Sequence, residues 1–280
     1  MGNVILSAFS DEYADDFEEQ LKAMRSFGID HIELRHINGK NVSVLTKSDV
    51  AEAKAMLSHY GIQVSAIGSP LGKIKLDGNL NAHMETARRI FETANELHTK
   101  LVRVFSFYAP DGKSITEMKH EVLAGLETML SIADTYGITL CHENEANIYG
   151  DIPERVLELT EHFDDRLKCV FDMGNYVLEN INPFPDAYDL LKPYIAYFHI
   201  KDALFEGAVV PFGKGNGQIA EILSAHRQAS PSDFFATLEP HLQTFSGLNA
   251  LVGRTFQNPY QYENAQTAFT DAVTCWKELI

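Results

Sequence analysis

Four side chains that can bind a metal ion or move a proton close four successive apolar segments in the second half of the chain. Glu143, Asp172 and Glu239 each end such a segment, and His199 is the last but one residue of another. Three carboxylates at one place repel one another unless protons or a cation neutralise them. Oxygen and nitrogen ligands without sulfur suit Mn²⁺, Mg²⁺, Co²⁺ or Zn²⁺. Each residue alone is an ordinary polar strand end, but together the four predict a site for one divalent metal ion.

The segments that must position these residues recur regularly. Eight short apolar runs, rich in β-branched and aromatic residues, are each followed by a segment with helical or partly helical spacing. The runs cover residues 4–9, 31–34, 62–67, 101–106, 138–143, 168–172, 195–200 and 234–239. Alternating strands and helices favour a parallel sheet, and eight such units in 280 residues predict an α/β fold, a single (β/α)8 TIM barrel forming one domain over residues 1–280. A doubly wound open sheet is the runner-up, but the turn at residues 10–13 lacks the glycines usual there.

The helical segments are marked by apolar spacing and by glycines at their ends. Phe17, Leu21 and Met24 follow a helical period, and Gly28 stands where that helix would end. Further helices are expected over residues 48–60, 81–97, 114–136 and 262–279, and Pro153 is placed to open another. Residues 203–232 contain several glycines and are expected to form a long loop, and residues 256–261 a surface connection.

The barrel would gather the reactive residues at one rim, because active sites of such barrels lie at the carboxyl ends of the strands. Glu145 and Lys201 stand two residues beyond Glu143 and His199 and so return to the same side of each strand. Both are candidates to bind substrate, and Lys201 could equally neutralise a metal-binding carboxylate.

Three other polar residues on the strands have a less direct relation to this rim. His142 precedes Glu143 and should point to the opposite face, which favours a structural role over the substrate contact that we also consider for it. Glu33 and Arg103 lie on the second and fourth strands. We expect them to form a buried ion pair low in the barrel, with substrate binding as the alternative.

The composition excludes several classes of partner. Lys and Arg total 23 and Asp and Glu 39, a formal net charge of −16, and no basic run offers a patch for nucleic acid. The three cysteines form no CxxC pair, which argues against a disulfide framework or thiolate zinc site and suits a cytoplasmic protein. Neither a signal peptide nor an apolar stretch of the ~20 residues that span a membrane is found, so no membrane partner is expected.

Four motifs resemble the xylose-isomerase-like barrels, a family of sugar isomerases and epimerases, inosose-processing enzymes and apurinic endonucleases. The motifs are Cys141-His142-Glu143-Asn144-Glu145, Phe171-Asp172-Met173-Gly174-Asn175, Phe198-His199-Ile200-Lys201-Asp202 and Leu238-Glu239-Pro240. The glycine-rich stretch 211–217 and Ile32-Glu33-Leu34 are also similar to family segments. The resemblance implies that Glu143, Asp172, His199 and Glu239 are the metal ligands.

One departure from the family bears on the reaction. Many relatives have a histidine three residues after the strand-six aspartate, and the endonucleases use it in a cluster of zinc ions; here that residue is Asn175. The departure and the net charge argue against a DNA repair enzyme. Asn175 remains a candidate to hydrogen-bond a substrate hydroxyl.

The expected reaction is proton transfer next to the carbonyl of a ketose-like substrate, giving isomerisation or epimerisation. The resemblance suggests Glu143 and Glu239 as the acid and base on opposite sides of the substrate. A lyase or dehydratase acting on a keto-sugar or inosose is one alternative, and a non-catalytic sugar-binding barrel is another. The sequence leaves open the substrate, its phosphorylation, the metal and the oligomeric state, a homo-oligomer included.

Overall fold

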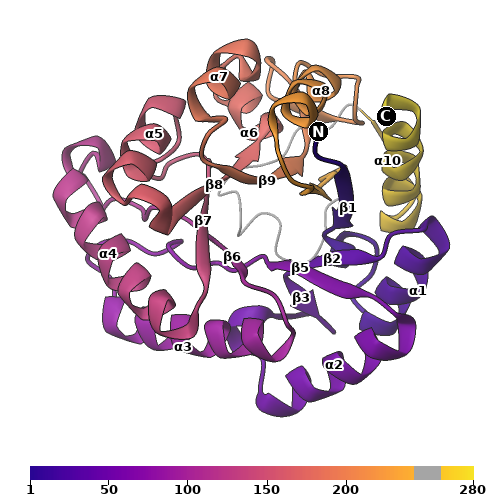
Figure 1. Ribbon diagram of the computed structural model, residues 1–280, viewed down its shortest axis with the longest axis horizontal. Helices are drawn as coiled ribbons and strands as arrows, with labels where there is room; N and C mark the ends of the chain where they lie inside the picture. Colours follow the sequence, from indigo (N-terminus) through magenta and orange to yellow (C-terminus); the bar gives the residue numbers. More distant parts are fainter. Residues whose placement is uncertain (243–259) are drawn as a thin grey trace.

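The computed structural model describes residues 1–242 and 260–280, and its centre is one eight-stranded sheet. The strands run in the order β1-β12-β9-β8-β7-β6-β5-β2, and every recorded pairing between them is parallel. Their bounds are β1 Val4–Ala8, β2 His31–Leu34, β5 Gln63–Ile67, β6 Leu101–Val104, β7 Thr139–Glu143, β8 Leu167–Asp172, β9 Ile195–Ile200 and β12 Phe234–Leu238. The sheet curls into a nearly closed barrel with β1 beside β2 (Figure 1). The predicted TIM barrel and its eight strands are therefore confirmed.

Helices surround the strands on the outside of the barrel (Figure 1). The main ones are α1 Phe17–Phe27, α2 Lys47–Tyr60, α3 Leu80–Glu96, α4 Lys119–Tyr136, α5 Pro153–His162, α6 Met173–Leu178, α7 Tyr188–Leu191, α8 Ile219–Ala229 and α10 Ala265–Leu279. Gly28, the glycine predicted to end α1, adopts positive φ, and so do Gly61 and Gly137 at the ends of α2 and α4; glycine reaches this conformation without a steric penalty. Pro153 lies in the first turn of α5, as predicted.

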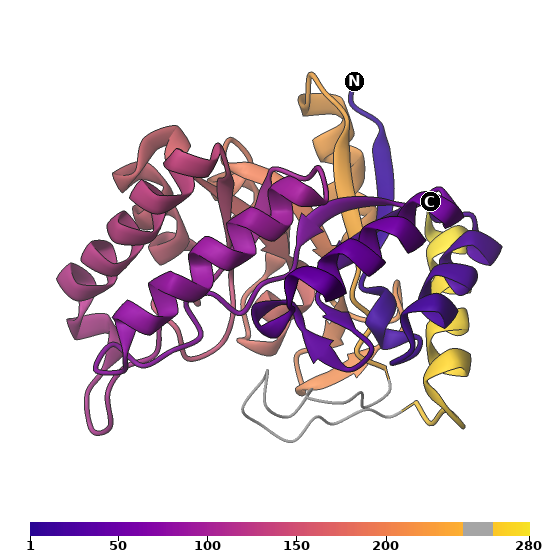
Figure 2. The same cartoon turned by 90° about the horizontal axis from the view of Figure 1, so that it is seen from below.

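Short elements fill the connections, mostly at the carboxyl ends of the strands. Two hairpins are formed by β3 His36–Ile37 with β4 Lys40–Asn41 and by β10 Asp202–Leu204 with β11 Ala208–Val210. The remaining short helices are η1 Ser10–Glu12, η2 Val42–Val44, η3 Ile115–Glu117, η4 Asp164–Arg166 and η5 Pro183–Ala187. Figure 2 shows β10 and the β3 hairpin at the same end of the molecule.

Two sequence-based expectations about local structure need correction. Residues 203–232 are not simply a long loop, because they contain β11 and the helix α8. Ile219, Ile222 and Leu223 bury one face of α8, a helical spacing that the neighbouring glycines obscured. The helix expected from residue 114 begins at Lys119, after the separate turn η3. The surface connection expected at 256–261 lies mostly outside the described residues.

The interior of the barrel is packed beneath the reactive rim. A small cluster of fully buried side chains joins Ala66, Cys141, Val170 and Tyr197, from β5, β7, β8 and β9. The last three precede Glu143, Asp172 and His199 by two residues, so they lie on the same face of their strands. An apolar floor therefore supports the polar groups above it.

No helix among the described residues is long and apolar enough to cross a bilayer.

Candidate metal centre

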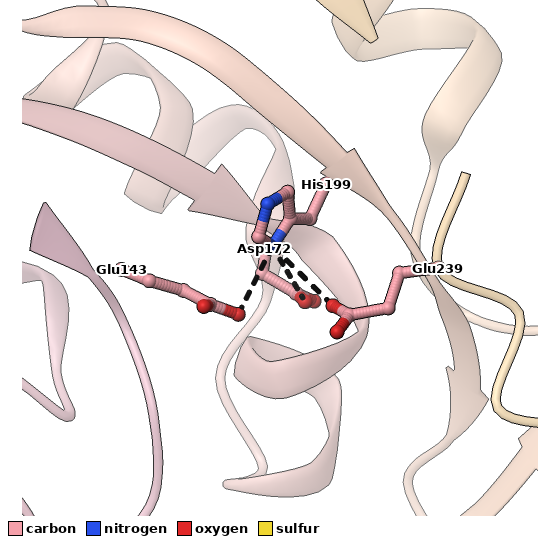
Figure 3. Close-up of side chains that lie close together, drawn as sticks. All are labelled: Glu143, Asp172, His199 and Glu239. Carbon is pink, nitrogen blue, oxygen red and sulfur yellow. Dashed lines mark ion pairs between the residues drawn. The ribbon is translucent and has the colours of Figure 1, made fainter. Parts of the chain in front are cut away.

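The four predicted metal ligands come together at the carboxyl ends of adjacent strands. Glu143 and Asp172 are the last residues of β7 and β8, His199 lies in β9, and Glu239 directly follows β12. Each offers a ligand atom, and these atoms all lie within 4.8 Å of one another. Figure 3 shows the three carboxylates directed toward the same ring nitrogen. The side chains are at most 3% exposed, so their charges are poorly screened by water.

The ring nitrogen at the centre of the cluster is Nδ1 of His199. It lies 3.1 Å from Oε1 of Glu143, 3.3 Å from Oε2 of Glu239 and 4.0 Å from Oδ2 of Asp172 (Figure 3). Nδ1 makes no hydrogen bond of normal geometry among the described residues. A buried nitrogen facing three carboxylates without such a bond fits the coordination of a divalent cation, as does this mixed set of oxygen and nitrogen donors.

The opposite ring nitrogen has a specific partner at the base of the site. Nε2 of His199 lies 3.0 Å from Oε2 of Glu33, and the hydroxyl of Tyr197 donates to Oε1 of Glu33 at 3.0 Å. All three side chains are completely buried. The predicted ion pair between Glu33 and Arg103 is therefore wrong, since the barrel directs Glu33 to His199 and Arg103 to Glu143 instead.

The charges around the ligands shift their pKa values in different directions. Burial lowers the pKa of His199, but the charges of Glu33, Glu143 and Glu239 outweigh it and hold that pKa well above its usual value. Burial raises the pKa of Asp172 to about 7, against the opposing charge of Lys201. Burial also opposes ionisation of Glu143, yet His199 and Arg103 hold its pKa at about 2. Without a metal ion, a proton on His199 adds to the positive charge that Arg103 and Lys201 bring to these carboxylates.

Two predicted substrate-binding residues lie directly against the ligand cluster. Nζ of Lys201 is 2.9 Å from Oδ2 of Asp172 and 3.1 Å from Oε2 of Glu239. It also donates to Oδ1 of Asn175 at 3.1 Å, while the amide nitrogen of Asn175 is 3.3 Å from Oε1 of Glu143. Lys201 thus neutralises two ligand carboxylates, and Asn175 links the ammonium group to a third.

The other two predicted substrate-binding residues lie in different surroundings. Glu145 is near the mouth of the site, where Oε2 accepts a hydrogen bond of 3.2 Å from Lys73. His142 points elsewhere: its Nε2 is 2.9 Å from Oγ of Ser106, and its ring packs against Gly150. Burial lowers the pKa of His142 to about 4. This neutral, buried ring therefore supports the segment after β7, in agreement with the structural role that the strand alternation favours.

Sequence reasoning missed several charged residues at the site. Arg35 follows β2, and its guanidinium contacts Glu239 at 3.1 Å, Asp11 at 2.8 Å and Glu12 at 3.3 Å. Nε2 of His241 is 3.4 Å from both Glu12 and Glu239. Their positions beyond strand ends, at Leu34-Arg35 and Leu238-Glu239-Pro240-His241, were the available signal.

Arg35, Arg103 and Lys73 lie over two aromatic rings at the site, and one of these rings, that of Phe105, lines the pocket. Arg35 and Arg103 lie over the ring of Phe9 at 4.1 and 5.2 Å, while Arg103 and Lys73 lie over that of Phe105 at 5.0 and 4.3 Å. The pocket is lined by Arg35, Lys73, Arg103, Phe105, Glu143, Glu145, Glu239 and His241. The guanidinium and ammonium groups of this pocket can donate hydrogen bonds to the oxygens of a bound molecule, and the aromatic rings exclude water from one side of it.

Comparison with known proteins places the barrel in a family. Residues 21–241 match the family model of the xylose isomerase-like TIM barrel. No curated protein matches the chain in sequence.

Solved structures with the same fold include three of known description. D-allulose 3-epimerase from Methylomonas sp. in complex with D-allulose is 14% identical, with a TM-score of 0.74 over 100% of this chain and 98% of that one. The probable 3-DHS dehydratase of petrobactin synthesis from Bacillus anthracis is 17% identical, with a TM-score of 0.73 and 99% of this chain covered and 99% of that one. A xylose isomerase-like TIM barrel protein from Mycobacterium smegmatis in complex with magnesium is 16% identical, with a TM-score of 0.70 over 100% and 97% of the two chains. At these identities the likeness concerns the fold.

Proposed function

Because this chain belongs to the xylose isomerase-like TIM barrel family, we propose that it is a metal-dependent isomerase or epimerase of a small ketose-like substrate. One observation carries the proposal: four buried side chains at the carboxyl ends of neighbouring strands place their ligand atoms within 4.8 Å of one another. The epimerase bound to D-allulose, a structural neighbour, supports a sugar or sugar-derived substrate.

One divalent ion, Mn²⁺, Mg²⁺, Co²⁺ or Zn²⁺, would be held by Glu143, Asp172, His199 and Glu239. When bound, such an ion polarises a substrate carbonyl and stabilises the negative charge that develops on its oxygen. The magnesium complex of a structural neighbour supports a hard cation of this kind. The three cysteines are free, which suits a reducing cytoplasm.

Proton transfer is assigned to the two glutamates. Glu143 and Glu239 lie on either side of His199 (Figure 3), and in the proposed reaction one removes the proton next to the carbonyl while the other returns it to the opposite face. Nη1 of Arg103 lies 3.1 Å from Glu143 and 4.0 Å from Glu239, which orients both carboxylates and favours their ionised form. A carboxylate that binds a metal ion and also faces Arg103 is a weakened base, so the substrate carbon must be acidified by the positive charge around it.

The remaining polar residues are assigned to the substrate's oxygens. Lys201 and Asn175 lie beside the ligand carboxylates, where an ammonium and an amide can hold a hydroxyl group next to the reacting carbon. Glu145 lines the mouth and can accept a hydrogen bond from a more distant hydroxyl. His142 is assigned no contact with the substrate; it stabilises the loop that carries Glu145.

A lyase or dehydratase is the second candidate, because the same proton removal can be followed by loss of a leaving group. The probable dehydratase among the structural neighbours supports this second candidate. The two reactions differ in product: an epimer or isomer retains the substrate's mass, whereas a dehydratase releases water.

The test is solvent exchange in deuterium oxide. Metal-loaded protein is incubated with ketoses, their phosphates and inososes, and deuterium at the carbon next to the carbonyl is followed by NMR. We expect exchange with at least one compound, and its loss in Glu143→Gln and Glu239→Gln variants that still contain metal. Substrate binding without exchange would indicate a binding protein. Exchange at the wild-type rate in both metal-loaded variants would contradict the assignment of the glutamates.

A further inference from the structure

We propose that Glu33, held by Tyr197, is a positioning residue that makes Nδ1 of His199 the metal-binding nitrogen. The proposal rests on the metal site proposed above. Glu33 comes from β2, at one end of the sheet order, and His199 from β9, so their 3.0 Å contact crosses the interior of the barrel. Glu33, Tyr197 and His199 are all completely buried, which leaves little freedom for another arrangement.

The chemistry of the two groups decides which ring nitrogen carries a proton. A neutral imidazole has one nitrogen that donates and one that accepts, whereas an ionised carboxylate only accepts. In the neutral ring, which is the form that binds a metal ion, Oε2 of Glu33 therefore requires the proton on Nε2 of His199, and the lone pair is left on Nδ1. Nδ1 is the nitrogen that faces the three carboxylates. A metal ion needs that lone pair, so Glu33 prepares the ligand without touching the ion.

The surroundings also fix the ring's orientation. Phe9 and Tyr197 contact the His199 ring edge-on, with centroids at 5.1 and 5.6 Å. The Tyr197 hydroxyl donates to Oε1 of Glu33, its one side-chain acceptor among the described residues. Tyr197 thus determines which oxygen of Glu33 is available to His199.

This arrangement makes a distinctive prediction for Glu33→Gln, which nearly preserves the shape of the side chain. The Tyr197 hydroxyl will keep the amide oxygen as its acceptor, so the amide NH₂ will face Nε2 of His199. Nε2 must then accept, and the ring proton moves to Nδ1, where it competes with the metal. We expect the affinity for Mn²⁺, measured by calorimetry without substrate, to fall roughly 10–100-fold.

The double variant separates positioning from simple cross-barrel support. Tyr197→Phe alone should change Mn²⁺ affinity by no more than about twofold, because Glu33 still accepts from Nε2. In Glu33→Gln/Tyr197→Phe the amide is free to turn its oxygen toward Nε2, so much of the lost affinity should return. If Glu33 only fastens β2 to β9, the double variant will bind Mn²⁺ no better than Glu33→Gln, and the proposal is overturned.

Two further measurements make the result decisive. Glu158→Gln is the matched control, because Glu158 also accepts from a tyrosine hydroxyl, that of Tyr149, but lies on α5 outside the barrel; its Mn²⁺ affinity should equal that of the wild type. In Mg²⁺-loaded wild type with ¹⁵N-labelled histidine, the proton of His199 should reside on Nε2, a result that needs no variant to fold. A proton on Nδ1 overturns the proposal.

The same experiments distinguish this proposal from the proposed function. If the wild-type protein binds no divalent metal, the proposed metal site does not exist, and both proposals fail. A protein that binds metal through Nδ1 but exchanges no substrate proton retains the positioning role of Glu33 and loses only the proposed reaction.

Discussion

The ammonium nitrogen of Lys201 lies 2.9 Å from Oδ2 of Asp172, so a permanent cation stands directly against one of the candidate metal ligands. It also lies 3.1 Å from Oε2 of Glu239. Burial opposes the charge of Lys201, but Asp172 and Glu239 hold the pKa of this lysine well above its usual value. Lys201 is therefore a fixed positive charge within the cluster before any metal ion binds, in addition to the proton on His199.

Lys201→Met should change metal affinity in opposite directions at low and high pH. At a pH high enough to ionise Asp172 in the variant, we expect tighter Mn²⁺ binding than in the wild type, because a repelling cation has been removed. Lys201 opposes the burial that raises the pKa of Asp172 to about 7, so the variant's Asp172 will have a still higher pKa. At about pH 7, where about half of the wild-type Asp172 is ionised, this carboxyl will be largely protonated in the variant, and Mn²⁺ binding will be weaker than in the wild type. Calorimetry at the two pH values checks the crossing; affinities that shift in parallel would contradict it.

His199→Ala should abolish most metal binding while the barrel still forms. The wild type is expected to bind one divalent ion per chain, and loss of the central nitrogen should lower that affinity by at least about 100-fold. Circular dichroism checks the fold, and elemental analysis with calorimetry gives stoichiometry and affinity. His120→Ala, at an exposed position of α4, is the control. Unchanged affinity in His199→Ala would show that the metal is bound elsewhere.

Asp202→Asn should destabilise the glycine-rich segment after β11. Oδ2 of Asp202 accepts from the backbone N–H groups of Gly213 and Gly215 at 2.8 and 2.9 Å, and Oδ1 accepts from Gly217 at 2.9 Å. An amide would direct its own donor at one or two of these N–H groups and remove the charge that strengthens the bonds. We expect the free energy of unfolding to fall by about 2–4 kcal/mol, measured with urea.

A matched substitution shows whether that loss comes from the buried contacts. Asp189→Asn changes an exposed aspartate of α7 whose partner is Lys192, and surface pairs of this kind contribute at most ~1 kcal/mol. Equal destabilisation by the two substitutions would contradict the role given to Asp202.

Asp49 should contribute to stability only above strongly acidic pH. A hydrogen bond from Lys40, followed by those from Thr46, lowers the pKa of Asp49 from 3.8 to about 2 in the folded protein. The unfolded chain therefore takes up this proton first, and the contribution of Asp49 is lost as the pH falls from about 4 to about 2. Unfolding followed at several pH values should show a shallower acid loss for Asp49→Asn than for the wild type. Glu52→Gln, an exposed change on the same helix, is the control; an equally shallow loss there would refute the assignment.

Local patterns in the sequence were sufficient to predict the barrel. Alternation of apolar runs with helical spacing reflects which side chains each element must bury, and glycine at positions 28, 61 and 137 marks where the chain needs positive φ. The α8 helix shows the limit of this reasoning, because glycines nearby masked a short buried stripe.

The placement of Glu143, Asp172, His199 and Glu239 at one rim also follows from the sequence, since all parallel strands of a barrel direct their carboxyl ends the same way. The partners of these residues do not follow from the sequence. Glu33 lies 166 positions before His199, and Arg35 lies 204 before Glu239. No periodicity relates such distant residues, and a charged residue on a strand can pair with any opposite charge across the interior. Closure of the barrel and the packing of Phe9 and Tyr197 select one pairing, because each buried charge must find its partner within hydrogen-bonding distance or remain uncompensated.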